Sequence, residues 1–141
     1  MSLNVAYTAT STSTGDGRNG HVASSDGRLD FDVKFPKEMG GPGGATNPEQ
    51  LFSAGWAACF HQAVRNVAKD MGLTLSGDTV KVDVGIGQDE TGNFGLAGTI
   101  TGTLPGLTQT QADEVMEKSH QMCPYSRATS GNVDVTVTAT V

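Results

Sequence analysis

The chain has 141 residues, of which 36% are hydrophobic and 17% charged, and its formal net charge is −6. This length and composition exclude a disordered chain and predict a single domain over residues 1–141, which needs neither disulfides nor a structural metal to fold. The negative charge, without any cluster of Lys and Arg, argues against nucleic acid or an anionic membrane as a partner.

The N-terminus lacks the basic segment and apolar stretch of a secretory signal. The most apolar window is residues 51–60, whereas a bilayer span needs about 20 residues. We therefore expect a cytoplasmic protein with no membrane partner. In a reducing cytosol, two cysteines are more often catalytic or metal-binding than structural.

Three short strands are predicted in the first third of the chain. Apolar residues alternate with polar ones over 5–9 and 29–35, and a shorter strand is expected over 21–24. In the third strand, one face is expected to be buried through Leu29, Phe31, Val33 and Phe35. The glycine-rich loop over 36–45 lacks the Gly-Lys-Ser/Thr sequence of a phosphate-binding loop, so we interpret it as a tight chain reversal packed against a neighbour.

A long helix is predicted from about Pro48 to Met71. Thr46 or Asn47 is expected to cap it, and Gly72 to end it. Its first half is apolar nearly all round, which is typical of a buried helix, and its small residues would allow another helix to approach closely. The second half is amphipathic.

The remaining residues predict two strands, a helix and a closing strand. The strands lie over 80–86 and 94–103, the helix runs from Thr108 to about Met122, and the last strand follows Gly131. Pro124 prevents simple continuation of that helix. The order βββ–α–ββ–α–β predicts an α+β domain, with an antiparallel sheet packed around the long central helix.

Cys59 lies in the middle of the long helix. From its own helix alone, it is interpreted either as a small buried hydrophobe or as a reactive thiol. It lies too far from the helix N-terminus to be stabilised as a thiolate by the helix dipole. A reactive Cys59 would therefore need a cation from elsewhere in the fold.

Cys123 ends the second predicted helix, where the dipole disfavours a thiolate. It is thus the poorer first nucleophile of the two, and either a helix-end packing residue or a resolving partner. Zinc is not favoured, because there is no Cys-x-x-Cys and His61 points about 200° away from Cys59 on a helix. The same geometry rules out His61 as a base for Cys59, and His120 is expected on the exposed side of its helix.

Arg18 and Glu49 carry no strong local signal. An arginine in a glycine-rich turn is usually solvated, and a glutamate in the first helical turn usually interacts with the helix dipole or a cap.

Several segments in combination resemble the organic hydroperoxide resistance proteins of the OsmC-like family, and the match extends over nearly the whole chain. The most specific segments are Asn47-Pro48-Glu49-Gln50-Leu51-Phe52, Ala58-Cys59-Phe60 and Cys123-Pro124-Tyr125-Ser126. The sequence departs from the family pattern at Trp56, where Tyr is frequent, and at Asn19, where an acidic residue is common. Neither departure removes a catalytic position.

The resemblance implies an OsmC-like fold, assembled as an intertwined homodimer in which strands wrap two long central helices. It also implies a thiol peroxidase that uses no metal, haem or flavin. Cys59 would be the peroxidatic cysteine and Cys123 the resolving one. Arg18 would be the cation that holds the Cys59 thiolate, oriented through bidentate hydrogen bonds with Glu49.

In that mechanism, Cys59 reduces an organic or fatty-acid hydroperoxide to an alcohol, its sulfenic acid forms a disulfide with Cys123, and a lipoylated protein re-reduces the disulfide. Two alternatives stay open. One is a peroxidase of the OsmC branch with a different physiological role. The other is a non-catalytic redox sensor or binding protein, which would be expected to lack one of the four residues.

Overall fold

The computed structural model describes residues 2–141 in two units, residues 2–51 and residues 52–141, and each contains a three-stranded sheet. We describe each unit by itself. Helix α1 (Pro48–Asp70) begins in the first unit and continues through the second. The mixed helix and strand content confirms the predicted α+β class. Within residues 2–141, no helix combines the length and hydropathy needed to cross a membrane.

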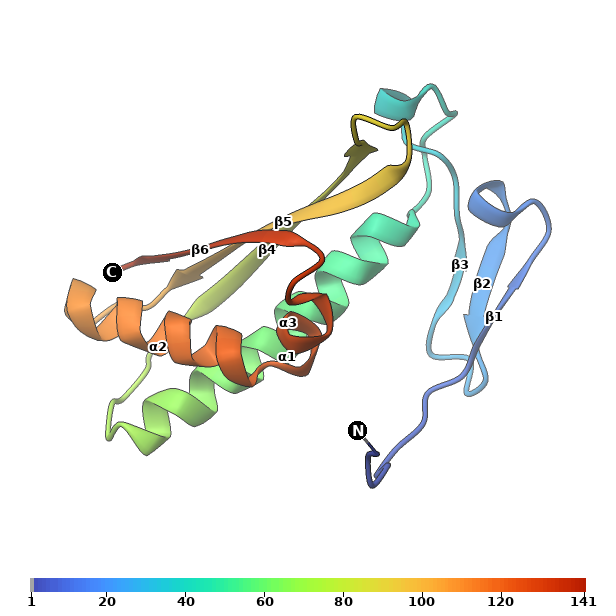
Figure 1. The fold of residues 1–141 in the computed structure, drawn as a ribbon. Coiled ribbons are helices and arrows are strands. Elements are labelled where there is room, and N and C mark those ends of the chain that lie inside the picture. The colour runs from blue at the N-terminus through green and yellow to red at the C-terminus, as the bar shows by residue number, and fades with distance from the viewer. Residues whose placement is uncertain (1) are drawn as a thin grey trace. The chain divides into compact units, whose positions relative to one another are not determined.

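The first unit is an antiparallel meander of β1 (Ser11–Thr14), β2 (His21–Ser24) and β3 (Asp30–Asp32) (Figure 1). A 3-10 turn over Gly17–Asn19 joins the first two strands and carries Arg18. The Asn19 side chain accepts a hydrogen bond of 3.1 Å from the backbone N–H of Phe35, which ties this turn to the chain after β3. The predicted meander and its turns are thus confirmed.

Two details of the predicted meander are wrong. Residues 5–9 form no strand, and Val5 and Tyr7 are 65% and 80% exposed, because no neighbouring strand pairs with this segment in the described chain. The expected buried face of the third strand also fails. Val33 is buried at 1%, but Leu29 and Phe31 are more than two-fifths exposed.

The glycine-rich loop is a chain reversal, as predicted. A Cβ at Gly41 would collide with the Phe35 backbone, and the N–H of Gly43 donates to the Phe35 carbonyl at 3.0 Å. Val33 forms an isolated parallel bridge with Thr46 on the far side of the loop. The reversal therefore returns the chain to the start of α1.

Both ends of α1 lie where the sequence predicts. Asn47 caps its start, because the Asn47 side-chain oxygen accepts from the backbone N–H of Gln50 at 2.9 Å. After Asp70, Gly72 adopts a left-handed conformation with φ 71°, and the Leu73 N–H donates to the Ala68 carbonyl at 2.8 Å. This is the hydrogen-bonding pattern of a glycine C-cap.

The second sheet has the order β4-β5-β6, with β4 at Thr79–Gln88, β5 at Phe94–Thr103 and β6 at Asp134–Thr140 (Figure 1). β4 and β5 form an antiparallel hairpin, but β5 and β6 pair in parallel. The prediction of an antiparallel sheet is wrong for this pair. The helical connection between β5 and β6 carries the chain back to the end from which β5 starts, and alternation within a strand does not reveal its direction.

The connection from β5 to β6 contains two helices rather than the one predicted. α2 (Gln109–Met122) starts with the predicted Thr108–Gln111 capping box. α3 (Pro124–Thr129) follows at once, and Cys123 is both the C-cap of α2 and the N-cap of α3. Pro124 ends the first helix and also begins the next one, because proline suits the first helical position. The element order is therefore βββ–α–ββ–α–α–β.

Two glycines on one face of β5 bring α1 and α2 onto the same side of the second sheet. Gly98, Ile100 and Gly102 alternate along that face, and Ile100 is fully buried. A Cβ at Gly98 would lie 3.3 Å from the Trp56 ring of α1, and one at Gly102 would collide with Met116 of α2. The helices therefore pack closely where β5 has no side chains.

The first half of α1 is only partly covered in the single chain. Trp56 and Phe60 are buried in the core, but Ala54 and Ala58 are exposed. The prediction of a buried helix thus holds for the side of α1 that faces the sheet, where Trp56 lies against β5. The opposite side presents small residues.

Candidate functional site: two cysteines and an arginine–glutamate pair

The two cysteines lie side by side although 64 residues separate them. The Cys123 sulfhydryl donates to Cys59 Sγ at 3.7 Å, and both thiols are free. Cys59 is half-buried, whereas Cys123 is completely buried. A disulfide bond is about 2.05 Å long, so the sulfurs need to approach by only about 1.7 Å to form one. The geometry suits reversible dithiol–disulfide chemistry.

The helix that the sequence analysis missed contributes to the surroundings of Cys59. The backbone N–H of Tyr125, in the first turn of α3, lowers the pKa of the Cys59 thiol. The first amides of a helix have no partner within the helix, so they are free to interact with such an acceptor. The sequence Cys123-Pro124 was a usable signal, because a proline just after a residue of extended conformation often marks a helix start.

Within residues 52–141, the Cys59 thiol is nonetheless a weaker acid than an ordinary cysteine. Burial raises its pKa, the contact with Cys123 raises it further, and the Tyr125 amide offsets only part of this effect. The prediction that Cys59 needs a cation therefore agrees with the electrostatics of the second unit. A thiolate here requires a positive charge that residues 52–141 do not place beside it in this structure.

Aromatic rings surround the thiol pair. Phe52 lies edge-on to Trp56 with ring centroids 5.6 Å apart, and edge-on to Tyr125 at 6.5 Å. Trp56 and Phe60 are buried, so they belong to the core rather than to an open pocket wall. Phe52 and Tyr125 are partly exposed, and they are the aromatic residues of this group that remain accessible to a ligand.

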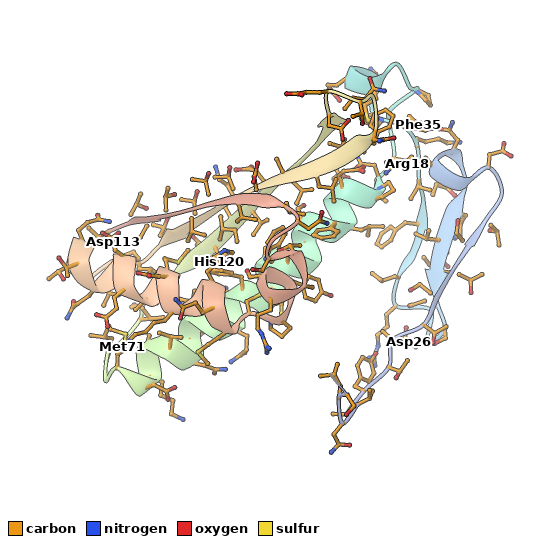
Figure 2. The ribbon with its side chains drawn as sticks, viewed as in Figure 1. Arg18, Asp26, Phe35, Met71, Asp113 and His120 are labelled. Atoms are coloured by element: carbon orange, nitrogen blue, oxygen red, sulfur yellow. The ribbon has the colours of Figure 1, made fainter. Side chains whose placement is uncertain are left out.

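Arg18 and Glu49 form a bidentate ion pair in the first unit. The two guanidinium nitrogens donate to the two carboxylate oxygens at 2.9 and 2.8 Å. The Arg18 guanidinium also lies 5.9 Å from the centre of the Phe35 ring, and both side chains are labelled in Figure 2. The hydrogen bond from Arg18 lowers the pKa of Glu49 despite its partial burial, and the same bond raises the pKa of Arg18. The guanidinium is thus held in a fixed plane.

Each pair lies within one unit, and α1 contributes one member to each. Glu49 is in the first turn of α1 and Cys59 is near its middle. Arg18 and Glu49 belong to residues 1–51, and the cysteines to residues 52–141. The structure therefore brings together the two members of each predicted pair, and the catalytic roles of all four residues stay predictions.

The histidines do not join the thiols in a metal-binding group. His61 Nε2 lies 2.6 Å from an Asp78 carboxylate oxygen, and Arg65 binds the same carboxylate. Burial alone would raise the pKa of Asp78, but the hydrogen bonds from His61 and Arg65 hold it below its usual range. Across residues 2–141, no group of three or more His, Cys, Asp or Glu side chains is arranged to hold a metal ion.

The sequence predicted that His120 lies on the exposed side of α2, and this prediction is wrong. Its ring is half-buried and lies 6.4 Å from the Phe60 ring, and its Nδ1 is fully covered without a hydrogen-bond partner among the described residues. Figure 2 labels this side chain on α2. The position of residue 120 on the helix is compatible with either an exposed or a buried side chain, and packing against the Phe60 ring accounts for its burial.

The fold is thus an α+β fold with a half-buried cysteine on a long helix, beside a buried cysteine at a helix junction. The family model described as "OsmC-like protein" matches residues 41–138. This chain belongs to the OsmC-like protein family.

Several similar proteins are named organic hydroperoxide resistance proteins. An organic hydroperoxide resistance protein of Xanthomonas axonopodis pv. citri is 48% identical over 136 residues, which cover 95% of this chain and 94% of that protein. A crystal structure of an organic hydroperoxide resistance protein from Legionella pneumophila matches with a TM-score of 0.92 at 42% identity, covering 98% of this chain and all of that one. The Elizabethkingia anophelis protein of the same name matches with a TM-score of 0.91 at 45% identity, with 98% and 99% covered.

Because of the Arg18–Glu49 ion pair, we expect the difference in unfolding free energy between the wild type and a Glu49 variant to depend on pH. Because the folded-state pKa of Glu49 is lowered from its ordinary 4.5, the pair contributes stability above about pH 4.5 and loses it as the pH falls through the folded value. We expect Glu49→Gln to unfold about 1 kcal/mol more easily than the wild type at pH 7, and no more easily near pH 2. Urea unfolding followed by circular dichroism at stepped pH values measures this difference.

The control for that experiment is Glu90→Gln, which alters an exposed carboxylate in the turn between β4 and β5. It is expected to change the unfolding free energy by less than about 0.5 kcal/mol at every pH. A Glu49→Gln deficit that stayed constant or grew toward low pH would contradict the role assigned to the ion pair.

Proposed function

We propose that this protein is a cysteine-based peroxidase that reduces organic hydroperoxides to alcohols. The names of its relatives support a general role in organic hydroperoxide resistance. The observation that carries the chemical proposal is the contact of 3.7 Å between a half-buried and a fully buried thiol. Such a pair supplies one accessible nucleophile and one protected partner that resolves it.

The proposed reaction has three balanced steps. The Cys59 thiolate attacks the terminal oxygen of ROOH, and, with one proton taken up, the O–O bond breaks to give Cys59 sulfenic acid and ROH. The Cys123 thiol then attacks the sulfenic sulfur and releases water as the Cys59–Cys123 disulfide forms. A lipoyl dithiol on a lipoylated protein finally exchanges with this disulfide, which restores both thiols and leaves the lipoyl group oxidised. No metal, haem or flavin takes part.

The different burial of the two thiols supports this order of events. Cys59 is the more exposed of the two, and the Tyr125 amide lowers its pKa, so it is the thiol that a peroxide reaches. Cys123 is fully buried and its sulfur lies 3.7 Å from that of Cys59, as expected of a protected thiol that resolves the oxidised Cys59. The partly exposed rings of Phe52 and Tyr125 offer apolar contacts to an alkyl or fatty-acid chain.

Arg18 is the proposed cation for the Cys59 thiolate, and Glu49 the residue that orients it. Burial raises the pKa of Cys59, so a positive charge is needed to populate the thiolate at neutral pH. The Arg18 guanidinium uses two donors for Glu49 and retains others for a further acceptor. Cytoplasmic localisation also forms part of the proposal, because the cycle requires both thiols to be kept reduced.

An intertwined homodimer completes the proposal. Ala54 and Ala58 form an exposed small-residue surface on α1, which is suited to the close approach of a second helix. Val5 and Tyr7 alternate as exposed apolar residues in an extended segment without a paired strand. Both features are costly in a monomer and are expected where a second copy of the chain covers them.

The first test is peroxide consumption with dihydrolipoamide as the reductant. We expect the wild type to consume tert-butyl hydroperoxide faster than hydrogen peroxide, and Cys59→Ser to consume neither above background, because the nucleophile is gone. Cys123→Ser is expected to complete one turnover and then stop in the presence of dihydrolipoamide. Equal rates for the wild type and Cys59→Ser would refute the peroxidase proposal and favour a non-catalytic binding protein.

The second test addresses the role of Arg18. In a Cys123→Ser background, the pH dependence of Cys59 alkylation by iodoacetamide gives the pKa of that thiol directly. An opposite charge at close range typically lowers a pKa by about 1–3 units, so Arg18→Met should shift the alkylation midpoint upward by about that amount. Arg18→Lys is the matched control, and its midpoint should lie between the two. A midpoint unchanged by Arg18→Met would place the guanidinium away from the thiol.

The third test is the mass in solution. Light scattering at micromolar concentration is expected to give twice the 14.6 kDa of one chain. Ala54→Glu places a charge on the exposed small-residue surface and should shift the protein toward the monomer. Lys69→Glu, at the exposed far end of α1, is the control and should leave the mass unchanged. A monomeric wild type would contradict the dimer.

A further inference from the structure

A buried hydrogen bond runs parallel to the contact between the two thiols. The Trp56 indole Nε1–H donates to the Ser126 hydroxyl oxygen at 3.1 Å, and both residues are only 1% exposed. Trp56 precedes Cys59 by one turn of α1, and Ser126 follows Cys123 by one turn of α3. The hydrogen bond and the thiol contact therefore link the same two segments of the chain, side by side.

The indole is held in one position by its neighbours. Its six-membered ring packs over Gly98 of β5, where a Cβ would lie 3.3 Å away. The indole also forms a T-shaped contact with the Phe52 ring. Because the core packs on several sides of the ring, the direction of the N–H is fixed. The hydrogen bond from Trp56 therefore fixes the position of the Ser126 hydroxyl along α1, and it fixes the position of α3 in the same way.

We propose that Trp56 is a positioning residue that holds α3, through Ser126, so that Cys123 stays within reach of Cys59. This inference rests on the proposed function. Trp56 supplies no atom to the proposed reaction, and its effect is on the second step of the cycle, when Cys123 attacks the oxidised Cys59.

The chemistry gives the positioning a measurable consequence. Cys59 sulfenic acid has two competing fates. Attack by the Cys123 thiol forms the disulfide and releases water, whereas attack by the sulfenate on a second ROOH forms Cys59 sulfinic acid and releases ROH. The first fate depends on the position of Cys123, and the second depends only on the peroxide concentration. A looser α3 therefore shifts the products from disulfide to sulfinic acid.

The Tyr125 backbone N–H links the Trp56–Ser126 hydrogen bond to Cys59. This amide lies between Cys123 and Ser126 in the chain and lowers the pKa of Cys59. Fixing Ser126 therefore fixes the amide as well as the resolving thiol. In catalysis, a displacement of about 1 Å from the productive geometry can cost about two orders of magnitude in rate. A single neutral hydrogen bond is expected to have a smaller effect, about fivefold on the resolution step.

The experiment compares Trp56→Phe, Ser126→Ala and Ser126→Thr with the wild type. Each reduced protein is treated with rising concentrations of tert-butyl hydroperoxide, and mass spectrometry then measures the ratio of Cys59 sulfinic acid to Cys59–Cys123 disulfide. We expect the first two variants to overoxidise at about fivefold lower peroxide than the wild type, because each removes the same hydrogen bond. Ser126→Thr keeps the hydroxyl and should behave as the wild type does.

Two further measurements separate positioning from a general loss of structure. In a Cys123→Ser background, dimedone trapping gives the rate of sulfenic acid formation. Trp56→Phe should lower this rate by no more than about twofold, because the first step does not use Cys123 and the Tyr125 amide offsets only part of the effect of burial on the pKa of Cys59. The double variant Trp56→Phe/Ser126→Ala should overoxidise no more readily than either single variant, because both act through one bond. A melting temperature that falls without any change in the product ratio would overturn the inference.

The failure of the inference is distinct from the failure of the proposed function. If the wild type forms neither sulfenic acid nor disulfide, the peroxidase proposal itself is wrong. If the wild type forms the disulfide and Trp56→Phe gives the same product ratio at every peroxide concentration, the peroxidase proposal stands and the positioning role of Trp56 is refuted.

Discussion

The structure is organised around the cost of placing an ionisable thiol against an apolar core. Cys59 lies on the same long helix as the buried residues Trp56 and Phe60, and burial raises its pKa. A buried position protects the thiol from solvent but disfavours the charged form that reacts. The α3 amide and, in the proposed mechanism, the Arg18 guanidinium both compensate for this cost. The amide comes from within the second unit, and the guanidinium belongs to the first.

Close packing of the helices on β5 determines where the two thiols meet. Gly98 and Gly102 leave room for Trp56 of α1 and Met116 of α2 on the same face of the sheet. The parallel pairing of β6 with β5 requires a connection long enough to hold α2 and α3, and their junction is the residue Cys123. Cys123 thus occupies the point where the connection changes from α2 to α3. The sheet topology and the redox geometry follow from the same arrangement.

Local patterns predicted much of this fold and little of its site. Alternation, caps and glycines located α1, α2 and the strands from β2 onward to within a few residues, because these signals act within one or two turns of chain. The parallel direction of β6 and the burial of His120 depend on contacts between distant segments, so they could not be read locally. The Cys59–Cys123 and Arg18–Glu49 pairs span 64 and 31 residues, and only the family resemblance linked their members. The short α3 was missed because Pro124 was read as a helix breaker alone.

The proposed mechanism assigns acidity and resolution to different parts of the chain. In that mechanism, the acidity of Cys59 depends chiefly on Arg18 and Glu49, which are contributed by residues 1–51. The resolution of its sulfenic acid depends on α3, which Trp56 holds through Ser126 within residues 52–141. A substitution in one part can therefore change the rate of the first step without changing the fate of its product. A substitution at Trp56 is expected to act mainly on the second of these, because its indole N–H donates to Ser126.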